Sequence, residues 1–527
     1  MRLYNWAAMH CVSAIGSQCI AFLQLGRNAW RFYQSIFIIK YFPPMSLSAI
    51  NQVMQAATVA FEGYRKISPG KRATFLQAIA AGLENSGDGL LELASTETNL
   101  PLPRLRGELA RTCFQLRMFA SLVKEGNWVE AIIDHAKPEK SPPAPDLRRM
   151  RIPIGPVVVF GASNFPFAYS TAGGDTASAL AAGCPVVVKQ HPAHSQTSFE
   201  VYQIIHQAAT EMGLPENVIQ HVEDKGFETG KMLVQHPATT GVGFTGSFNG
   251  GMALHAYAQE RKHPIPVFAE MGSTNPVLLL PGALAADSAG IAQKYAVSIT
   301  MSMGQFCTNP GLIFGLESAD LVHFIEALAI ELQSFSPSAM LHTGIEKAYM
   351  EKTASALSQK GVELQFSGKS GSRVPEVCIA RINAADFLEN PLVQEEIFGP
   401  WSLVVVCKDA LDMLNCRNAL AGQLTTTLMA SKGDFANFPF LVDAALNHSG
   451  RVIFNGVPTG VEVCGAMVHG GPHPACTDSR FSAVGPMAIQ RWTRPVCWQN
   501  APDTVLPPEL REKNPMNIRR MVDGKWQ

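Results

Sequence analysis

Val157-Val158-Val159-Phe160 is the stretch from which the fold can be worked out. A short, continuous run of apolar and mostly β-branched residues is typical of a strand buried on both faces of a sheet. Such runs recur, each followed by a helical pattern, with strands expected at 157–160, 186–188, 218–222 and 242–245 and helices at 171–182, 195–212, 227–235 and 247–259. Strands that alternate with helices predict right-handed βαβ units and a parallel sheet, with ligands at the carboxyl ends of the strands.

The alternation restarts after Gly272, with a strand expected at 276–280 and a helix that extends to Met303. We therefore expect a second α/β region that continues to about Gly460. Ahead of the first strand, apolar residues at helical spacing predict further helices, at 46–64, 73–83, 90–96 and 105–123, the first of them capped by Ser46 or Ser48. The proline-rich run at 141–145 breaks this pattern and predicts a linker.

The composition is that of a globular chain with a large core. The 527 residues suggest two to four domains at about 150 residues each, and 47% of them are apolar while 16% are charged. A net charge of −1 gives no reason to expect nucleic acid or a membrane surface as a partner. The 11 cysteines are scattered without a C-x-x-C pair, which favours reduced thiols in a cytoplasmic protein over disulfides or a zinc site.

Residues 1–44 differ in character from the rest of the chain. The segment is mostly apolar at first, but histidine, serine and glutamine interrupt it, and Arg2 is its single leading charge. It is too polar for a convincing transmembrane helix, and Ala14-Ile15-Gly16 is a poor cleavage site for a secretory signal. One alternative is a start codon assigned too early, with Met45 as the true first residue; the other is a role in export or at a membrane.

Three short strings carry the candidate chemistry: Phe160-Gly161-Ala162-Ser163-Asn164-Phe165-Pro166, then Phe268-Ala269-Glu270-Met271-Gly272-Ser273, then Gly304-Gln305-Phe306-Cys307-Thr308-Asn309-Pro310. Each string by itself is weak evidence. In this order they resemble the aldehyde dehydrogenase superfamily, and the resemblance extends from about Leu47 to Pro507. They supply an amide donor, a carboxylate and a thiol, which together can oxidise an aldehyde through a covalent thioester.

The resemblance implies a catalytic role for one residue in each string. Cys307 would be the nucleophile, and Glu270 would activate the water that hydrolyses the thioester. Asn164, together with the backbone N–H of Cys307, would hold the oxyanion. Without the resemblance, the same residues could be a small buried thiol, a solvated charge at a strand end and an asparagine bonded to its own turn.

A glycine-rich run lies ahead of the second string. Gly241-Val242-Gly243-Phe244-Thr245-Gly246 reads as G-x-G-x-x-G, a dinucleotide fingerprint, but its first two glycines precede or lie within the expected strand. The resemblance instead implies that Gly246 and Ser247 approach the cofactor pyrophosphate at a helix N-terminus. An ordinary turn from strand to helix is the alternative.

The resemblance implies further cofactor contacts. Lys189, at a strand end, would contact the adenosine ribose. In the string Glu395-Glu396-Ile397-Phe398-Gly399-Pro400, Glu396 would hold the nicotinamide ribose and Phe398 would support the ring. Gly272 is assigned to the same cofactor site. A solvated strand-end lysine and an ordinary turn are the structural alternatives.

The residues after Lys189 bear on the choice of cofactor. Many members of the family that prefer NAD have a glutamate three residues later, which repels a 2′-phosphate, but this chain has Pro192 there. The missing carboxylate and nearby basic groups such as His191 favour NADP, with NAD as the alternative.

His469 lies in the loop His469-Gly470-Gly471-Pro472, where most members of the family carry no histidine. In a glycine-rich loop near the site, His469 could tune the thiol or relay protons, so it joins the catalytic candidates. A histidine satisfied within its own loop is the alternative. The 14 histidines show no metal-ligand spacing, so we expect no metal.

The resemblance implies a fold of two Rossmann-like α/β domains plus a β oligomerisation extension. Residues 45–272 would form the NADP-binding domain, interrupted by the extension at 142–153, and residues 273–463 the catalytic domain. Residues 464–527 would hold the site loop, the oligomerisation strand and the C-terminal tail. A homodimer or homotetramer is expected.

The implied activity is the NADP-dependent oxidation of a small-molecule aldehyde to its acid. The strings at 171–176, 458–463 and 467–472 are closest to the branch that oxidises 2-oxoglutarate semialdehyde (2,5-dioxopentanoate) in sugar-acid catabolism. A branch that oxidises long-chain fatty aldehydes shares several of these strings, and a catalytically silent homologue is a third hypothesis. Arg480 is a candidate to bind the substrate carboxylate, against the alternative of a solvated surface arginine.

Overall fold

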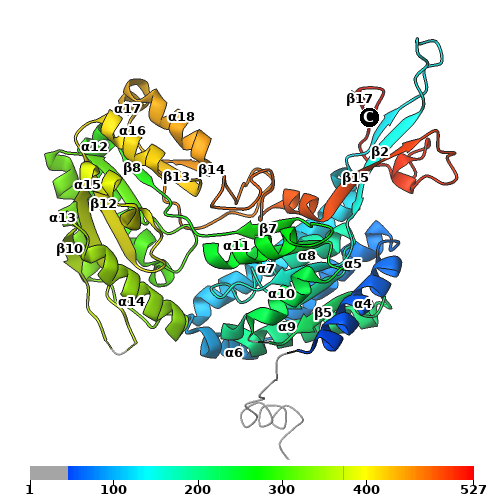
Figure 1. Ribbon diagram of the computed structural model, residues 1–527, viewed down its shortest axis with the longest axis horizontal. Helices are drawn as coiled ribbons and strands as arrows, with labels where there is room; N and C mark the ends of the chain where they lie inside the picture. The colour runs from blue at the N-terminus through cyan, green and yellow to red at the C-terminus, as the bar shows by residue number, and fades with distance from the viewer. Residues whose placement is uncertain (1–44, 225, 372) are drawn as a thin grey trace, which may run out of the picture. The chain divides into compact units, whose positions relative to one another are not determined.

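The computed structural model describes residues 45–224, 226–371 and 373–527 (Figure 1). The expectation for residues 1–44 therefore lies outside the described residues. The architecture that follows is that of the unit Ser46–Gln527. No helix within the described ranges is long and apolar enough to cross a membrane.

The first sheet contains five parallel strands in the order β5-β4-β3-β6-β7. They are β3 (Val157–Phe160), β4 (Val186–Lys189), β5 (Ile219–Val222), β6 (Gly241–Thr245) and β7 (Val267–Glu270). The helices that follow the first four of these strands are α8 (Gly174–Ala182), α9 (Ser195–Glu211), α10 (Phe227–Gln235) and α11 (Phe248–Gln259). The predicted parallel sheet is confirmed, and its register sets Phe160, Lys189 and Phe244 level at the carboxyl ends of three neighbouring strands.

Helix α8 begins at Gly174 and not at Thr171, where the small-residue pattern predicted it. The residues ahead of it form turns, since the amides of Gly173 and Gly174 donate to the carbonyls of Ser170 and Ala168. A Cβ on Gly173 would lie 2.5 Å from the carbonyl oxygen of Ala168, so this turn requires glycine.

Four helices precede the first sheet: α4 (Leu47–Tyr64), α5 (Pro69–Glu84), α6 (Asp88–Thr98) and α7 (Leu102–Glu125). The predicted cap of α4 is confirmed, because Ser46 Oγ accepts from the amide of Ala49 at 3.2 Å. The apolar faces of α5, α6 and α7 join the core of the first sheet, in which Phe119 of α7 and Val157 of β3 are both buried. This packing holds α7 against the sheet that carries the catalytic candidates Asn164 and Glu270.

The second sheet has seven strands in the order β10-β11-β12-β9-β8-β13-β14, and all neighbours are parallel except β10 and β11. The strands are β8 (Val277–Leu279), β9 (Leu312–Leu316), β10 (Glu363–Ser367), β11 (Cys378–Asn383), β12 (Trp401–Cys407), β13 (Gln423–Met429) and β14 (Ser449–Phe454). The helices are α12 (Pro281–Thr300), α13 (Ala319–Gln333), α14 (Thr343–Leu357), α15 (Ala384–Glu389), α16 (Ala410–Ala419), α17 (Lys432–Asn437) and α18 (Pro439–His448). The second α/β region predicted after Gly272 is therefore present.

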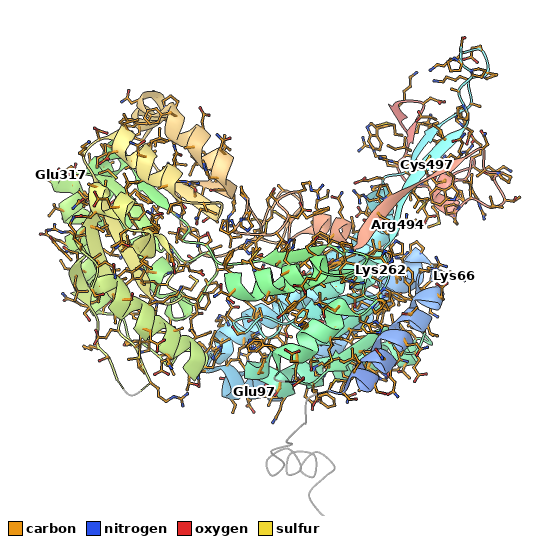
Figure 2. All side chains as sticks on the ribbon, viewed as in Figure 1. Lys66, Glu97, Lys262, Glu317, Arg494 and Cys497 are labelled. Carbon is orange, nitrogen blue, oxygen red and sulfur yellow. The ribbon has the colours of Figure 1, made fainter. Side chains whose placement is uncertain are left out.

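A third sheet pairs strands from distant parts of the chain in the order β15-β2-β1-β16-β17. It consists of β1 (Ile132–Asp134), β2 (Leu147–Pro153), β15 (Thr493–Gln499), β16 (Met521–Val522) and β17 (Lys525–Trp526). The run at 141–145 lies between β1 and β2, where a bridge joins Lys137 to Ala144, so it is a hairpin loop and not a linker. β15 is an edge strand, and its Arg494 and Cys497 are exposed (Figure 2).

Phe119→Ala tests how much the buried face of α7 contributes to stability. The side chain is 1% exposed, so its removal leaves a cavity and should lower the free energy of unfolding by about 3–5 kcal/mol. Phe227→Ala is the matched control, because Phe227 is 93% exposed and its loss should cost less than about 0.5 kcal/mol. Urea unfolding followed by circular dichroism measures both, and equal losses would contradict this packing.

Candidate active site

The Cys307 loop leaves the C-terminal end of α12 through a tight turn. Ser302, Met303 and Gly304 have φ of 50°, 56° and 62°, so three successive residues adopt left-handed backbone. That conformation is unfavourable for residues with a Cβ and is maintained only where surrounding contacts impose it. A Cβ on Gly304 would lie 2.2 Å from the carbonyl oxygen of Gly399, so glycine is required at this position.

Asn275 fixes the backbone at Cys307 and just after it. Its Nδ2 donates to the carbonyl oxygens of Cys307 at 2.8 Å and Asn309 at 2.9 Å, and its side chain is fully buried. The backbone N–H of Asn275 donates to Oε1 of Gln423, on β13, at 3.2 Å. Sequence reasoning missed Asn275, although a polar residue between the Glu270 string and an apolar strand is a signal that could have found it.

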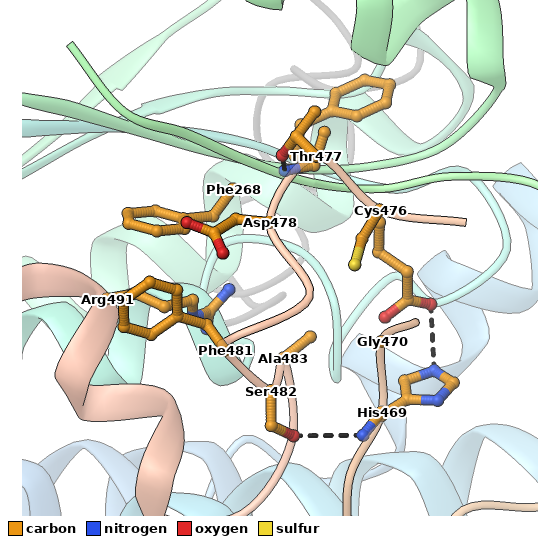
Figure 3. A pocket seen from close by; sticks show the side chains of 13 residues that line it. Phe268, His469, Gly470, Cys476, Thr477, Asp478, Phe481, Ser482, Ala483 and Arg491 are labelled. Atoms are coloured by element: carbon orange, nitrogen blue, oxygen red, sulfur yellow. Dashed lines mark hydrogen bonds and ion pairs between the residues drawn. The ribbon is translucent and has the colours of Figure 1, made fainter. Parts of the chain in front are cut away.

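Cys307, Glu270 and His469 converge, although they lie after α12, at the end of β7 and in the C-terminal region. His469 Nε2 is 3.6 Å from Cys307 Sγ and 2.9 Å from Glu270 Oε1. His469 and Glu270 are 1% and 4% exposed. The backbone N–H of His469 donates to Ser482 Oγ at 3.1 Å, which holds its loop in place (Figure 3). Glu270 is therefore not a solvated charge, and the ring of His469 is engaged outside its own loop.

Burial and charge set the protonation states of the thiol and the carboxylate. Burial raises the pKa of Glu270, but the contacts with His469 and Cys307 outweigh it and hold the pKa below its ordinary value. Burial also raises the pKa of Cys307, and the charge of Glu270 raises it further. Near neutral pH, an ionised carboxylate therefore lies beside a protonated thiol. Attack by Cys307 requires a base, and His469 and Glu270 are both within reach.

The carboxylate of Glu270 keeps capacity to bind a further donor. In the described part of the chain, its contacts are with the side chains of His469 and Cys307, and neither oxygen accepts a well-oriented hydrogen bond. A carboxylate has lone pairs for several donors, and a buried one with spare lone pairs can orient and activate a water molecule.

Asn164 follows β3 and reaches the Cys307 loop. Its buried side-chain Nδ2 donates to the backbone carbonyl oxygen of Gln305 at 3.1 Å. Its backbone carbonyl oxygen accepts from Arg104 Nη2 at 2.8 Å. The alternative of an asparagine bonded to its own turn is therefore wrong. An amide nitrogen carries two N–H donors, so one is available to an oxyanion beside the loop.

Gly246 and Ser247 lie where β6 meets α11. Ser247 caps the helix, since its Oγ accepts from the amide of Gly250 at 3.2 Å. The amide of Gly246 donates to the backbone carbonyl of Glu270 at 3.0 Å, which ties the turn to the end of β7. The first two glycines of the G-x-G-x-x-G run lie inside β6, so the run is not a phosphate loop. The N-terminus of α11, which has 12 residues, suits an anionic pyrophosphate.

Lys189 and His191 lie at the carboxyl end of β4. Lys189 is 9% exposed, so the alternative of a solvated lysine is wrong; burial lowers its pKa, and the charge of Asp224 opposes that shift. Burial lowers the pKa of His191 to about 3, so its ring carries no charge near neutral pH. Of the two, only Lys189 is cationic, and Asp224, just after β5, is an acid beside it that sequence reasoning missed.

Glu396 and Gly272 face each other. A Cβ on Gly272 would lie 2.1 Å from Glu396 Oε2, so only glycine leaves room. Burial raises the pKa of Glu396 to about 7, and the Glu396 charge adds to burial and Glu270 in raising the pKa of Cys307. Phe398 is half-buried. Glu396, a predicted nicotinamide contact, thus lies near the thiol with Gly272 beside it, and the glycine turn at the α11 N-terminus fits the phosphates of a dinucleotide.

A pocket adjoins Glu270 and His469 on the side of the C-terminal segment. Its lining includes Phe268, Phe481 and Arg491 (Figure 3). Arg480 lies outside this lining. Its side chain is 81% exposed and donates to Asp478 through Nε at 2.8 Å and Nη2 at 2.6 Å. The structure therefore favours the surface alternative for Arg480.

Glu270, Cys307 and His469 each offer one ligand atom, all within 4.8 Å of one another, which is a spacing that a metal ion could use. The same atoms belong to the candidate nucleophile and the two candidate bases beside it. The sequence expectation of no metal stays a prediction.

Known proteins share both the sequence and the fold. Residues 38–472 match the aldehyde dehydrogenase family. The chain is 44% identical to an alpha-ketoglutaric semialdehyde dehydrogenase of Acinetobacter baylyi over 92% of each chain. It is 45% identical to alpha-ketoglutaric semialdehyde dehydrogenase 2 of Azospirillum brasilense, over 90% of this chain and 91% of that one. The crystal structure of gamma-glutamyl-gamma-aminobutyraldehyde dehydrogenase from Burkholderia cenocepacia has the same fold, with a TM-score of 0.74 at 20% identity over 86% of this chain and 88% of that one.

The pH dependence of alkylation should report the protonation state of Cys307. The thiolate is the reactive form and its pKa is raised, so the rate with iodoacetamide should rise with pH and reach half-maximum well above about 8.5. Glu270→Gln removes a charge that raises this pKa, so the midpoint should move to lower pH and alkylation at pH 8 should become roughly tenfold faster or more. Mass spectrometry of the Cys307 peptide follows the reaction; an unchanged midpoint would show that the two groups are not coupled.

Proposed function

Because the chain belongs to the aldehyde dehydrogenase family, we propose that it oxidises 2-oxoglutarate semialdehyde (2,5-dioxopentanoate) to 2-oxoglutarate with NADP. Members of this family oxidise aldehydes with a nicotinamide dinucleotide. The observation that carries the choice of substrate is the 44–45% identity to two relatives named for this activity, over at least 90% of this chain. The convergence of Cys307, Glu270 and His469 supports the chemistry.

The residues of the site divide the reaction between them. Cys307 attacks the aldehyde carbon, and its proton passes to His469 Nε2, 3.6 Å away, which leaves Glu270 ionised for the later step. Asn164 and the backbone N–H of Cys307 stabilise the oxyanion of the thiohemiacetal. When bound, the nicotinamide cofactor accepts the hydride that leaves this carbon, which makes the adduct on Cys307 a thioester. Glu270 then takes a proton from the water that releases the acid.

The cofactor would be held by residues from both α/β regions. Gly246 and Ser247 would bind the pyrophosphate through the N-terminus of α11, and Lys189 would contact the adenosine ribose. Glu396 would hold the nicotinamide ribose, and Gly272 leaves the space in front of it. These assignments rest on the fit between the residue types and the ligand.

We also propose that the protein forms a homodimer or homotetramer through its third sheet. Aldehyde dehydrogenases are commonly oligomeric. β15 is an edge strand with the exposed side chains of Arg494 and Cys497, and an unpaired strand edge is a ready template for a second chain. Sedimentation of the intact protein measures the assembly.

A substrate panel tests the proposed activity. With NADP, kcat/KM for 2-oxoglutarate semialdehyde should exceed that for decanal by about 100-fold or more, since a site built for a polar substrate discriminates strongly against one that lacks those groups. Cys307→Ala should lose several orders of magnitude in turnover. A higher kcat/KM for decanal would assign the protein to the fatty-aldehyde branch. No oxidation of any aldehyde would identify a catalytically silent homologue.

Glu270→Gln should stall the reaction at the thioester. Because attack and hydride transfer precede the step that needs the base for water, stopped-flow absorbance should show a burst of about one NADPH per active site, followed by slow turnover. Linear kinetics near the wild-type rate would exclude Glu270 as the deacylating base.

We expect NADP to be preferred over NAD, because Pro192 stands where an acid would repel a 2′-phosphate and Lys189 lies at the same strand end; the charge of Asp224 beside Lys189 acts against this preference and limits its size. Pro192→Glu should weaken kcat/KM for NADP by on the order of 1–2 kcal/mol through like-charge repulsion, with little effect on NAD. Steady-state kinetics with both cofactors measures this, and a better kcat/KM with NAD in the unmodified enzyme would overturn the preference.

A further inference from the structure

Two arginines near the thiol have no carboxylate partner in the described residues. Arg111, on α7, donates through Nη1 to the carbonyl oxygen of Val461 at 2.9 Å and through Nη2 to the hydroxyl of Tyr169 at 3.3 Å. Arg451, on β14, donates to the carbonyl oxygens of Gly460 at 3.0 Å and Pro458 at 2.6 Å. Both guanidinium groups therefore donate to neutral backbone oxygens of one loop, residues 458–461, and Arg111 also donates to the Tyr169 hydroxyl.

The lack of a carboxylate distinguishes these arginines from their neighbours. Arg104, which precedes Arg111 on the same helix, is 3.3 Å from Glu108, and Arg491 is 2.7 Å from Asp175. Arg111 and Arg451 are half-buried, and the Nε of each is shielded from solvent without an acceptor. A guanidinium carries five donors and a permanent charge, so a partly buried one without a counter-charge is poised to take an anion.

A chain of contacts connects both arginines to Cys307. The guanidinium of Arg111 is 5.7 Å from the ring of Tyr169, that ring is 6.4 Å from the ring of His469, and His469 Nε2 is 3.6 Å from Cys307 Sγ. Arg451 donates to the carbonyl oxygens of Pro458 and Gly460, and Arg111 donates to that of Val461, so one short loop joins the two guanidinium groups. Arg111 is thus linked to Cys307 through Tyr169 and His469, and Arg451 is linked to Arg111 through the loop 458–461.

We propose that Arg111 and Arg451 form a cationic clamp, defined by these two residues, that binds the carboxylate of the substrate while its aldehyde carbon reaches Cys307. This inference rests on the proposed function, and it identifies the residues that would select a substrate with a carboxylate. An ω-aldehyde acid fits, because arginine grips a carboxylate through paired, charge-assisted hydrogen bonds. A fatty aldehyde would leave both charges uncompensated. The clamp replaces Arg480, whose donors are already taken by Asp478.

The test compares 2-oxoglutarate semialdehyde with pentanal, an uncharged aldehyde of the same chain length. In Arg111→Met and in Arg451→Met, the ratio of kcat/KM for the dioxo acid to that for pentanal should fall about 10- to 100-fold, as expected for losing a hydrogen bond to a charged group. Arg111→Lys, which keeps the charge, should fall less. Arg480→Ala is the matched control, in which the ratio should stay within about twofold. Equal loss on both substrates in the Met variants would overturn the clamp.

A second measurement does not depend on the variants folding. In the wild-type enzyme, glutarate should inhibit pentanal oxidation competitively and at least about tenfold more strongly than uncharged glutaramide, with the difference shrinking at high salt. Equal inhibition by the two would overturn the clamp. If the wild type prefers pentanal to the dioxo acid, the proposed function fails, and the glutarate arm still decides whether a carboxylate site exists.

Discussion

The buried charge of Glu270 is the constraint on which the rest of the site depends. An ionised carboxylate that is 4% exposed is costly unless a partner compensates it, and the partner here is His469, 2.9 Å away. That contact ties the C-terminal loop to the end of β7. The same charge raises the pKa of the Cys307 thiol, so the nucleophile stays protonated until a base accepts its proton. The charge of Glu270 therefore does two things: through His469 it holds the C-terminal loop in place, and it keeps the Cys307 thiol protonated.

The position of the nucleophile depends on polar groups buried between the two α/β regions. Asn275 comes just after the first sheet, yet it binds the backbone of the Cys307 loop and is itself bound by Gln423 of the second sheet. The left-handed turn then brings Gly304 so close to the backbone of Gly399 that a Cβ on Gly304 would not fit. The Gly304 turn holds the loop before Cys307, and Asn275 holds it after. The thiol is thereby kept in a fixed position beside Glu270 and His469.

Charge is distributed unevenly around the site, and this bears on what it can bind. At the predicted ribose edge, burial leaves His191 neutral, so Lys189 is the cation there and Asp224 lies beside it. In the loop 458–461, neutral carbonyl oxygens accept from Arg111 and Arg451. A site with an ionised Glu270 at its centre, and with two arginines that no carboxylate pairs with in the described residues, is better matched to an aldehyde with a distant carboxylate than to an apolar chain.

The sequence by itself determined the order of strands and helices in the first α/β region and the start of the second, and it singled out Cys307, Glu270 and Asn164 as candidates, because apolar periodicity and ordered strings are local properties of the chain. It misplaced the start of α8 and the role of residues 141–145, where backbone hydrogen bonds and a hairpin bridge override composition. Only the tertiary structure decided that His469 contacts both Cys307 and Glu270, that His191 is uncharged, and that Arg480 pairs with Asp478 while Arg111 has no carboxylate partner in the described residues. Those properties depend on burial and on neighbours from distant segments, and no local pattern contains either.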